Sequence, residues 1–265
     1  MIDAMGRQSQ MLLLSVLAGA WAGAEELPDR RFGFEAGMGL LSHDGFLQTP
    51  AGGEPGTATA GRPTVDELAV GDGSYRWVAG TVGLGRYALD VRYTTIGDSG
   101  HATLDTALVS QGNAFDAGSA VRTTLGLDGL SLAFTRSFAF GEDTRLRVGP
   151  WVGWTAFDLD VDGAGAAVDR SYRVYALGVN AVLDRTIGGG WRVAAEAIVA
   201  PAFEGAATRF TVEPSLSYGL SDRVEVRLAT RLAAFRYDDG HKQVWPNRLR
   251  IDRRVMPAVS VRWLP

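Results

Sequence analysis

Residues Arg31–Leu40 read RFGFEAGMGL, and their side chains alternate strictly between two kinds. One face carries Phe32, Phe34, Ala36, Met38 and Leu40, and the other carries Arg31, Gly33, Glu35, Gly37 and Gly39. Successive side chains of a β-strand point to opposite faces, so the segment predicts a strand with one apolar and one polar face. The wall of a transmembrane β-barrel has this pattern, because one face meets lipid and the other lines the lumen.

The alternation recurs along the chain and predicts two sets of inward and outward residues. Polar residues in the lumen-facing phase are Glu35, Asp90, Arg92, Arg145, Arg147, Arg173, Arg192, Glu196, Glu213, Glu225, Arg227 and Arg231. Tyr75 and Trp77 in one segment, and Tyr172, Val174 and Ala176 in another, are assigned to the lipid face. Trp77, Trp154, Trp191, Trp263 and Tyr172 then suit the aromatic girdles at the membrane interfaces. A soluble lipocalin-like barrel or sandwich is the alternative, with the apolar face turned inward.

Long and short connections alternate along the sequence. Long polar links are expected at about 42–72, 98–120, 159–169, 203–208 and 238–249, and short turns at 84–86, 141–144, 185–190 and 219–222. This asymmetry is typical of extracellular loops and periplasmic turns. Five loops and four turns predict an all-β, antiparallel, up-and-down barrel of about ten strands, with eight or twelve as alternatives.

The pair Asp128-Gly129 would by itself be a strong hairpin turn. A turn there would give an odd number of strands, and the long links after it would lie on the same side of the membrane as the short turns before it. We therefore predict one long strand from about Val121 to Phe140, with its first half beyond the membrane. Arg136 then lies on the lipid face, where a midplane position would cost about 2–4 kcal/mol.

Residues 1–24 have the features of a secretory signal. Arg7 supplies a positive charge, an apolar run follows from Met11, and Ala22-Gly23-Ala24 places small residues before the expected cleavage site. The apolar run is about 12 residues long, short of the roughly 20 that span a bilayer as a helix. The expected mature domain is the barrel of residues 25–265.

Composition excludes several other classes. No stretch approaches 18 consecutive apolar residues, and no long segment has helical periodicity, which excludes a helical membrane protein. The chain has no cysteine, so it has neither disulfides nor thiolate chemistry. The formal net charge is −4 with no basic block, which argues against nucleic acid as a partner.

Together these features resemble the small outer-membrane β-barrel proteins of Gram-negative bacteria, across the expected mature chain. The resemblance implies the bacterial outer membrane as location, with lipid, lipopolysaccharide and the barrel assembly machinery as partners. Such barrels usually end on an aromatic residue, whereas here Trp263 is followed by Leu264 and Pro265. The segment Gln111–Gly118 leading into Val121–Leu125 also resembles loop-to-strand segments of small barrels without an assigned activity.

At about ten strands the lumen is largely filled by side chains, because open aqueous channels need about 16–18 strands. We expect the inward charged residues to pair with one another and plug the lumen, since buried charges require partners. The predicted role is structural or surface-binding. A narrow anion-biased channel lined by the arginines is the alternative.

A rim-site hydrolase is the third hypothesis. Asp158 and Asp160, with Asp239 and His241, are similar to the paired-acid and Asp-x-His elements of the omptin proteases. A carboxylate beside a histidine can orient its tautomer and raise its basicity. We expect no metal site and no cofactor, because His-x-x-x-His spacing is absent and the Asp158–Asp162 run lacks the glycine and closing glutamate of a calcium loop. His43 and His101 are expected to be exposed loop residues.

Overall fold

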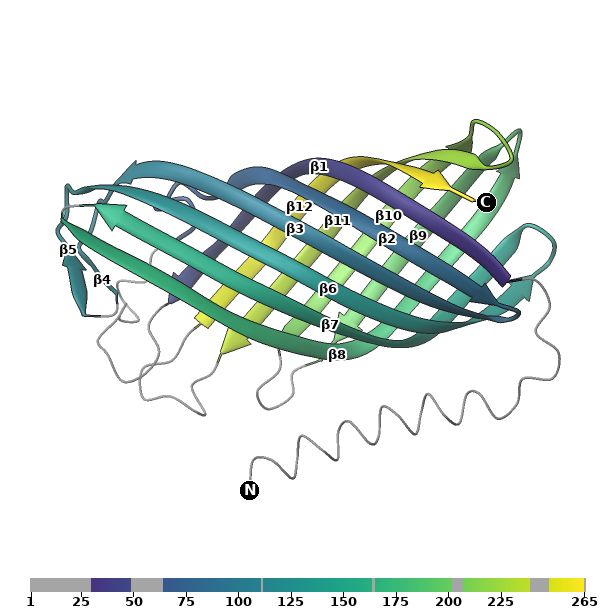
Figure 1. Cartoon of the computed structure of the whole chain (residues 1–265), viewed down its shortest axis with the longest axis horizontal. Helices are drawn as coiled ribbons and strands as arrows, with labels where there is room; N and C mark the ends of the chain where they lie inside the picture. Colours follow the sequence, from purple (N-terminus) through teal and green to yellow (C-terminus); the bar gives the residue numbers. More distant parts are fainter. Residues whose placement is uncertain are drawn as a thin grey trace, which may run out of the picture.

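The computed structural model describes residues 30–48, 64–110, 112–163, 165–201, 207–238 and 248–264 (Figure 1). The predicted signal, residues 1–24, lies outside these ranges. Among the described residues no helix is long and apolar enough to cross a membrane.

Ten antiparallel strands form one closed barrel, in the order β1-β12-β11-β10-β9-β8-β7-β6-β3-β2. Their bounds are β1 Arg30–Gln48, β2 Asp72–Leu84, β3 Tyr87–Thr103, β6 Ala120–Phe140, β7 Thr144–Gly163, β8 Ala166–Gly188, β9 Trp191–Ala200, β10 Thr208–Gly219, β11 Val224–Asp238 and β12 Arg248–Trp263. A separate hairpin consists of β4, Leu108–Ser110, and β5, Asn113–Phe115. The prediction of an all-β barrel with about ten strands is therefore confirmed, and eight and twelve strands are excluded.

The short turns lie where they were predicted, between β2 and β3, β6 and β7, β8 and β9, and β10 and β11. All four lie at one end of the barrel, where β1 also begins and β12 ends (Figure 1). We call this the turn end and the opposite one the loop end. β6 is a single strand across Asp128-Gly129, as predicted.

The predicted long link at 159–169 is wrong. β7 continues to Gly163 and β8 begins at Ala166, so only residues 164–165 join them. Gly165 has φ of 78°, a left-handed conformation that suits a tight turn. The polar residues of this stretch, such as Asp160 and Asp162, therefore belong to strands rather than to a long loop.

A belt of exposed apolar side chains surrounds the turn-end part of the barrel. It includes Phe32, Phe34, Met38, Leu40, Val91, Tyr93, Leu130, Phe138, Phe140, Trp154, Tyr175, Leu183, Trp191, Val199, Phe210, Leu216, Leu228, Leu232, Val259, Val261 and Trp263. On β1 the belt runs from Phe32 to Leu40, which corresponds to roughly 20 Å along the axis of a strongly tilted strand. This width matches the apolar band of a transmembrane barrel.

Beyond the belt, toward the loop end, the alternation is inverted. Thr124 and Asp158 are exposed on the outside, whereas Leu125, Phe157 and Leu159 are buried inside. The buried apolar residues of this region lie inside the barrel in one large cluster, which we call the apolar cluster, and a smaller one around Trp151 and Ile198. A barrel wall surrounded by water needs its apolar face inward, so the same strand changes its polarity where it leaves the belt.

This inversion corrects two of the predicted strand phases. Tyr172, Val174 and Ala176 point inward on β8, while Arg173 and Tyr175 point outward. Tyr172 stacks on Phe157 and Tyr237 with ring centroids 4.5 and 5.4 Å apart.

On β2 the predicted phase is also inverted, although Trp77 lies at the level of the belt. Tyr75 and Trp77 are buried in the lumen and stacked on each other, at 5.2 Å between ring centroids. Trp77 covers Gly37 of β1, where an added Cβ would lie only 2.2 Å from the indole ring. A glycine facing the lumen thus makes room for a tryptophan, and of the five predicted girdle aromatics only Trp154, Trp191 and Trp263 are outward-facing.

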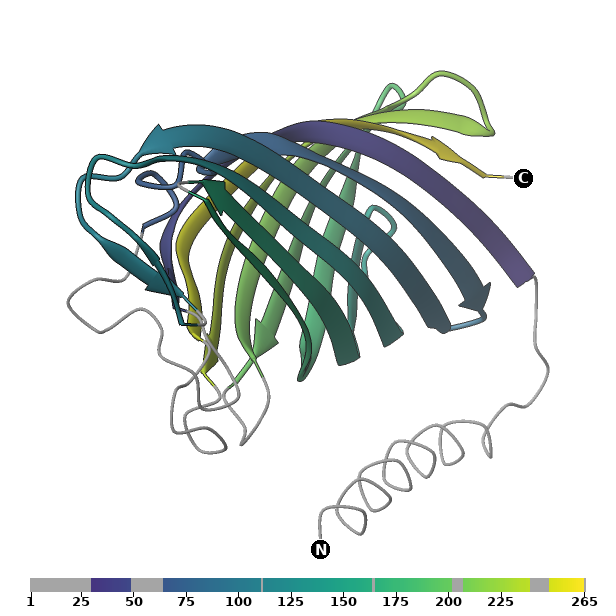
Figure 2. The same cartoon turned by 60° about the vertical axis from the view of Figure 1, so that its left-hand side comes forward.

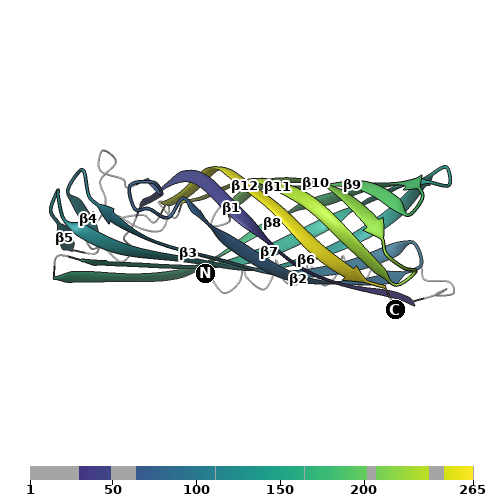
Figure 3. The same ribbon diagram turned by 90° about the horizontal axis from the view of Figure 1, so that it is seen from above.

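The two sides of the barrel differ in height. β6, β7 and β8 have 21, 20 and 23 residues, whereas β9 and β10 have 10 and 12. Figures 2 and 3 show the long strands extending past the others, with the β4–β5 hairpin beside their ends. Phe115 of this hairpin is fully buried in the apolar cluster, which anchors the hairpin to the taller wall.

The belt predicts where a charge is tolerated. Leu228 lies near the middle of the belt and faces outward, so Leu228→Arg should lower the free energy of unfolding from lipid vesicles by about 2–4 kcal/mol. Thr124→Arg, on the outer surface beyond the belt, should change it by less than about 0.5 kcal/mol. Urea titration of the folded fraction measures both. Equal losses in the two variants would show that the belt is misplaced.

Candidate functional site

The lumen inside the belt contains six arginines and five carboxylates joined by salt bridges. The arginines are Arg92, Arg147, Arg192, Arg227, Arg231 and Arg262, and the carboxylates are Glu35, Asp90, Glu196, Glu213 and Glu225. We call this set the lumen ion-pair network. Its members come from seven of the ten strands, β1, β3, β7, β9, β10, β11 and β12, and lie on the inward faces of those strands.

Glu213 of β10 is the centre of the network. Its carboxylate lies 3.3 Å from Arg92, 2.6 Å from Arg227 and 2.9 Å from Arg231. β3, which carries Arg92, is five strands from β10 in either direction around the barrel. The Arg92–Glu213 bridge therefore crosses the full width of the lumen, and Arg92 also approaches Glu196 of β9, at 3.6 Å.

Glu35 of β1 forms a second centre. Arg227 and Arg262 lie 3.1 and 2.9 Å from its carboxylate. Ser260 donates a hydrogen bond of 2.8 Å to the same carboxylate, and the Trp77 indole donates one of 3.3 Å. Arg227 thus links Glu35 to Glu213, so both centres belong to one connected cluster.

The remaining pairs extend the cluster toward the turn end. Arg192 and Arg262 each lie 3.7 Å from Glu225. Arg147 forms a separate pair with Asp90 at 3.0 Å, and Thr81 donates a 2.7 Å hydrogen bond to Asp90.

Burial makes the pairing obligatory. Glu213 and Glu35 are only 2% and 6% exposed, and an unpaired carboxylate at such a site would be strongly disfavoured. Arginine suits this role because its planar fork can donate to two carboxylates at once, as Arg227 does. The network lies in the lumen at the level of the belt, and the apolar cluster lies nearer the loop end.

Ten of the twelve predicted lumen residues belong to the network. Arg173 does not, because it lies in the inverted part of β8 and points outward. Arg145 is exposed at the turn end, across from Asp184 in the strand register, and no salt bridge is formed by it among the described residues.

The prediction missed three inward arginines in or beside the network: Arg209, Arg254 and, as a site residue, Arg262. Arg209 shares the phase of Thr211 and Glu213, and Arg254 shares that of Ser260 and Arg262. Arg209 directly precedes Phe210 and Arg254 directly precedes Val255, so extending the alternation by one residue in each strand would have found both.

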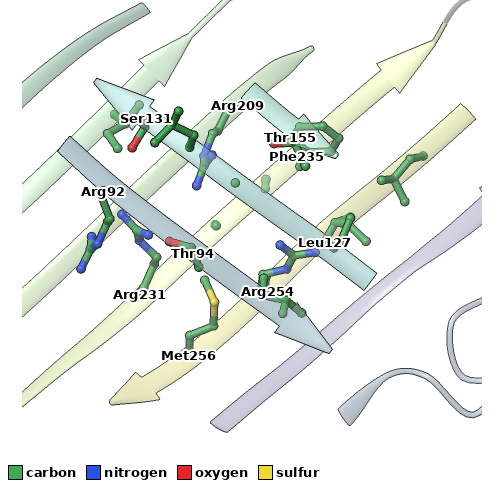
Figure 4. A pocket seen from close by; sticks show the side chains of 18 residues that line it. Arg92, Thr94, Leu127, Ser131, Thr155, Arg209, Arg231, Phe235, Arg254 and Met256 are labelled. Atoms are coloured by element: carbon green, nitrogen blue, oxygen red, sulfur yellow. The ribbon is translucent and has the colours of Figure 1, made fainter. Parts of the chain in front are cut away.

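A cavity lies between the ion-pair network and the apolar cluster. It is bordered by Arg92, Arg209, Arg231 and Arg254, by the hydroxyls of Thr94, Ser131 and Thr155, and by apolar residues that include Ile96, Leu127, Phe235, Ile251 and Met256 (Figure 4). We call it the arginine cavity. Figure 4 shows Arg209, Arg231 and Arg254 approaching the same space from β10, β11 and β12.

The predicted catalytic residues do not assemble within the described residues. Asp158 and Asp160 are exposed on the outer surface of β7, so they face away from the lumen and from the opposite wall. Asp239 and His241 lie outside the described residues. No group of three or more metal-ligating side chains is found in the described part of the chain.

The two described histidines are placed differently from each other. His101 is exposed on β3. His43 lies beyond the belt and, contrary to the prediction, is 2% exposed inside the barrel. Burial and the nearby charge of Arg254 lower the pKa of His43 to about 3, so its side chain is neutral at pH 7.

The sequence matches no protein-family model and no curated protein. Among solved structures, the outer-membrane protease OmpT from Escherichia coli has 8% identity, covers 92% of this chain and 99% of its own, and has a TM-score of 0.59. The transport unit of the Escherichia coli autotransporter AIDA-I and the Neisserial surface protein A have TM-scores of 0.40 and 0.37. The AIDA-I unit is 7% identical, over 92% of this chain and 94% of its own. The Neisserial protein is 10% identical, over 90% of this chain and 99% of its own. The chain therefore has the fold of the outer-membrane β-barrels, as predicted.

Removing the central carboxylate should be costly. Glu213→Gln leaves three arginines without their shared anion and should lower the free energy of unfolding by about 3–5 kcal/mol. Asp252→Asn is the matched control, since Asp252 bridges Arg236 and Arg250 on the exposed surface, and should cost less than about 1 kcal/mol. Urea unfolding in the same lipid measures both. A loss at Glu213 no larger than at Asp252 would contradict a structural role for the network.

Proposed function

We propose that this protein is a closed outer-membrane barrel with a structural or surface-binding role. The single observation that carries the proposal is the Arg92–Glu213 bridge, which joins opposite walls of the lumen. Around it, Glu213 and Glu35 hold arginines from β3, β11 and β12.

A second layer supports a closed lumen. The interior beyond the belt contains buried apolar side chains such as Phe157, Leu159 and Ile251. An ion crossing the barrel would have to pass both a charged and an apolar layer, and each would have to rearrange.

The projecting walls support a surface role. The long strands β6, β7 and β8 carry polar side chains on their outer surface beyond the belt, as a wall exposed to water requires. The four short turns favour the turn end as periplasmic and the loop end as extracellular. We further propose that residues 1–24 are cleaved during export, that the assembly machinery inserts the barrel, and that lipid and lipopolysaccharide contact its belt and rim.

The two alternative functions receive less support. An anion path would need free arginines along the lumen, whereas Arg92, Arg227 and Arg231 are held by carboxylates. A hydrolase of the omptin type would need acids facing across the rim, whereas Asp158 and Asp160 point outward.

Planar-bilayer recording tests the proposal. The refolded protein should insert without steady conductance, while a general porin reconstituted in the same way shows open-channel steps. Heat-modifiable migration on gels confirms that the inserted protein is folded. Steady conductance with an anion-biased reversal potential in a salt gradient would overturn the closed barrel and favour the narrow channel.

A further inference from the structure

The arginine cavity contains two positive charges that no carboxylate of the described residues neutralises. Arg209 donates to the Thr211 hydroxyl at 3.3 Å, and its guanidinium stacks 5.3 Å from the Trp151 ring centre. Arg254 has no hydrogen-bond partner for its Nε. Among the described residues, neither guanidinium has a carboxylate within salt-bridge distance.

The neighbouring carboxylates are already shared among other arginines. Glu213 forms salt bridges with Arg92, Arg227 and Arg231. Glu196 lies within salt-bridge distance of Arg92 and Arg231. The network itself has one arginine more than it has carboxylates, and Arg209 and Arg254 add two further cations at its upper side. Buried charges without counterions destabilise a fold, so Arg209 and Arg254, which have no salt-bridge partner among the described residues, point to an anion supplied from outside.

The cavity has the shape and chemistry for such an anion. Its volume is about 60 Å³. One water needs about 10–15 Å³, so there is room for about four to six groups of that size. Thr94, Ser131 and Thr155 add hydroxyl donors, while Leu127 and Phe235 form part of an apolar wall.

We propose that the arginine cavity binds a small organic anion, in which one carboxylate or phosphate group is joined to a short apolar chain. The head group lies between Arg209 and Arg254, where arginine forks donate to oxyanions in bidentate geometry. The chain lies against Leu127, Phe235 and Ile251 on the side of the apolar cluster. This inference goes beyond the closed-barrel role and does not depend on it, because a bound anion requires no passage through the lumen.

Isothermal titration calorimetry on the refolded barrel tests the inference, with butyrate as the probe and butanol and butylammonium as uncharged and cationic controls. Butyrate should bind saturably and more weakly at higher salt, and the two controls should not bind. The double variant Arg209→Met/Arg254→Met should weaken butyrate binding at least about tenfold, because two charge-assisted hydrogen-bond donors are lost. Both substitutions place an apolar chain beside apolar residues, so the variant should remain folded and heat-modifiable.

The control variant is Arg236→Met/Arg250→Met, which removes two exposed arginines from the outer surface of β11 and β12. It should bind butyrate as the parent protein does, although it loses two positive charges, as the Arg209→Met/Arg254→Met variant does. Unchanged affinity in the Arg209/Arg254 variant, equal binding of butanol or butylammonium, or no saturable butyrate binding would each overturn the inference. Inorganic phosphate binding as tightly as butyl phosphate would overturn the role of the apolar wall.

Discussion

The buried carboxylate of Glu213 is the interaction on which the lumen depends. Three guanidinium groups from two regions of the wall meet at this one carboxylate, and without it they would repel one another at short range. A nearby glycine makes room for an aromatic residue that contacts this network. Gly37 leaves space for Trp77, whose indole supports Glu35 and lies 5.2 Å from the Arg92 guanidinium.

A second constraint is the change of surroundings along each strand. A belt that faces lipid needs apolar side chains outside, and Leu228 and Val259 face outward there while Arg227 and Ser260 face inward. Beyond the belt the outside is water, so Asp158 faces outward and Phe157 inward. A strand can satisfy both regions because its period of two is unchanged and only the polarity of each face is exchanged.

This exchange explains what the sequence could and could not predict. Strand number and turns follow from the alternation and from glycines such as Gly85 and Gly141, whose positive φ suits tight turns. Most network residues follow from the phase within the belt. Arg173 and Tyr172 were assigned to the wrong faces because the prediction placed the apolar face of β8 outward along its whole length. The link at 159–169 was predicted wrongly because the polar residues there were interpreted as a loop. The pairing of Arg92 with Glu213 depends on closure of the barrel across 121 residues, which alternation alone does not encode.

The two filled layers and the cavity between them have a common physical origin. Charged side chains pair best where carboxylates are available, and apolar side chains pack best against one another, so the interior separates into a network and a core. At their boundary the last arginines of the polar layer have apolar neighbours on one side. The Arg209 guanidinium stacks on the Trp151 ring there, while the Nε of Arg254 has no hydrogen-bond partner. The two guanidinium groups that no described carboxylate neutralises, those of Arg209 and Arg254, therefore lie at the boundary between the layers, beside the arginine cavity.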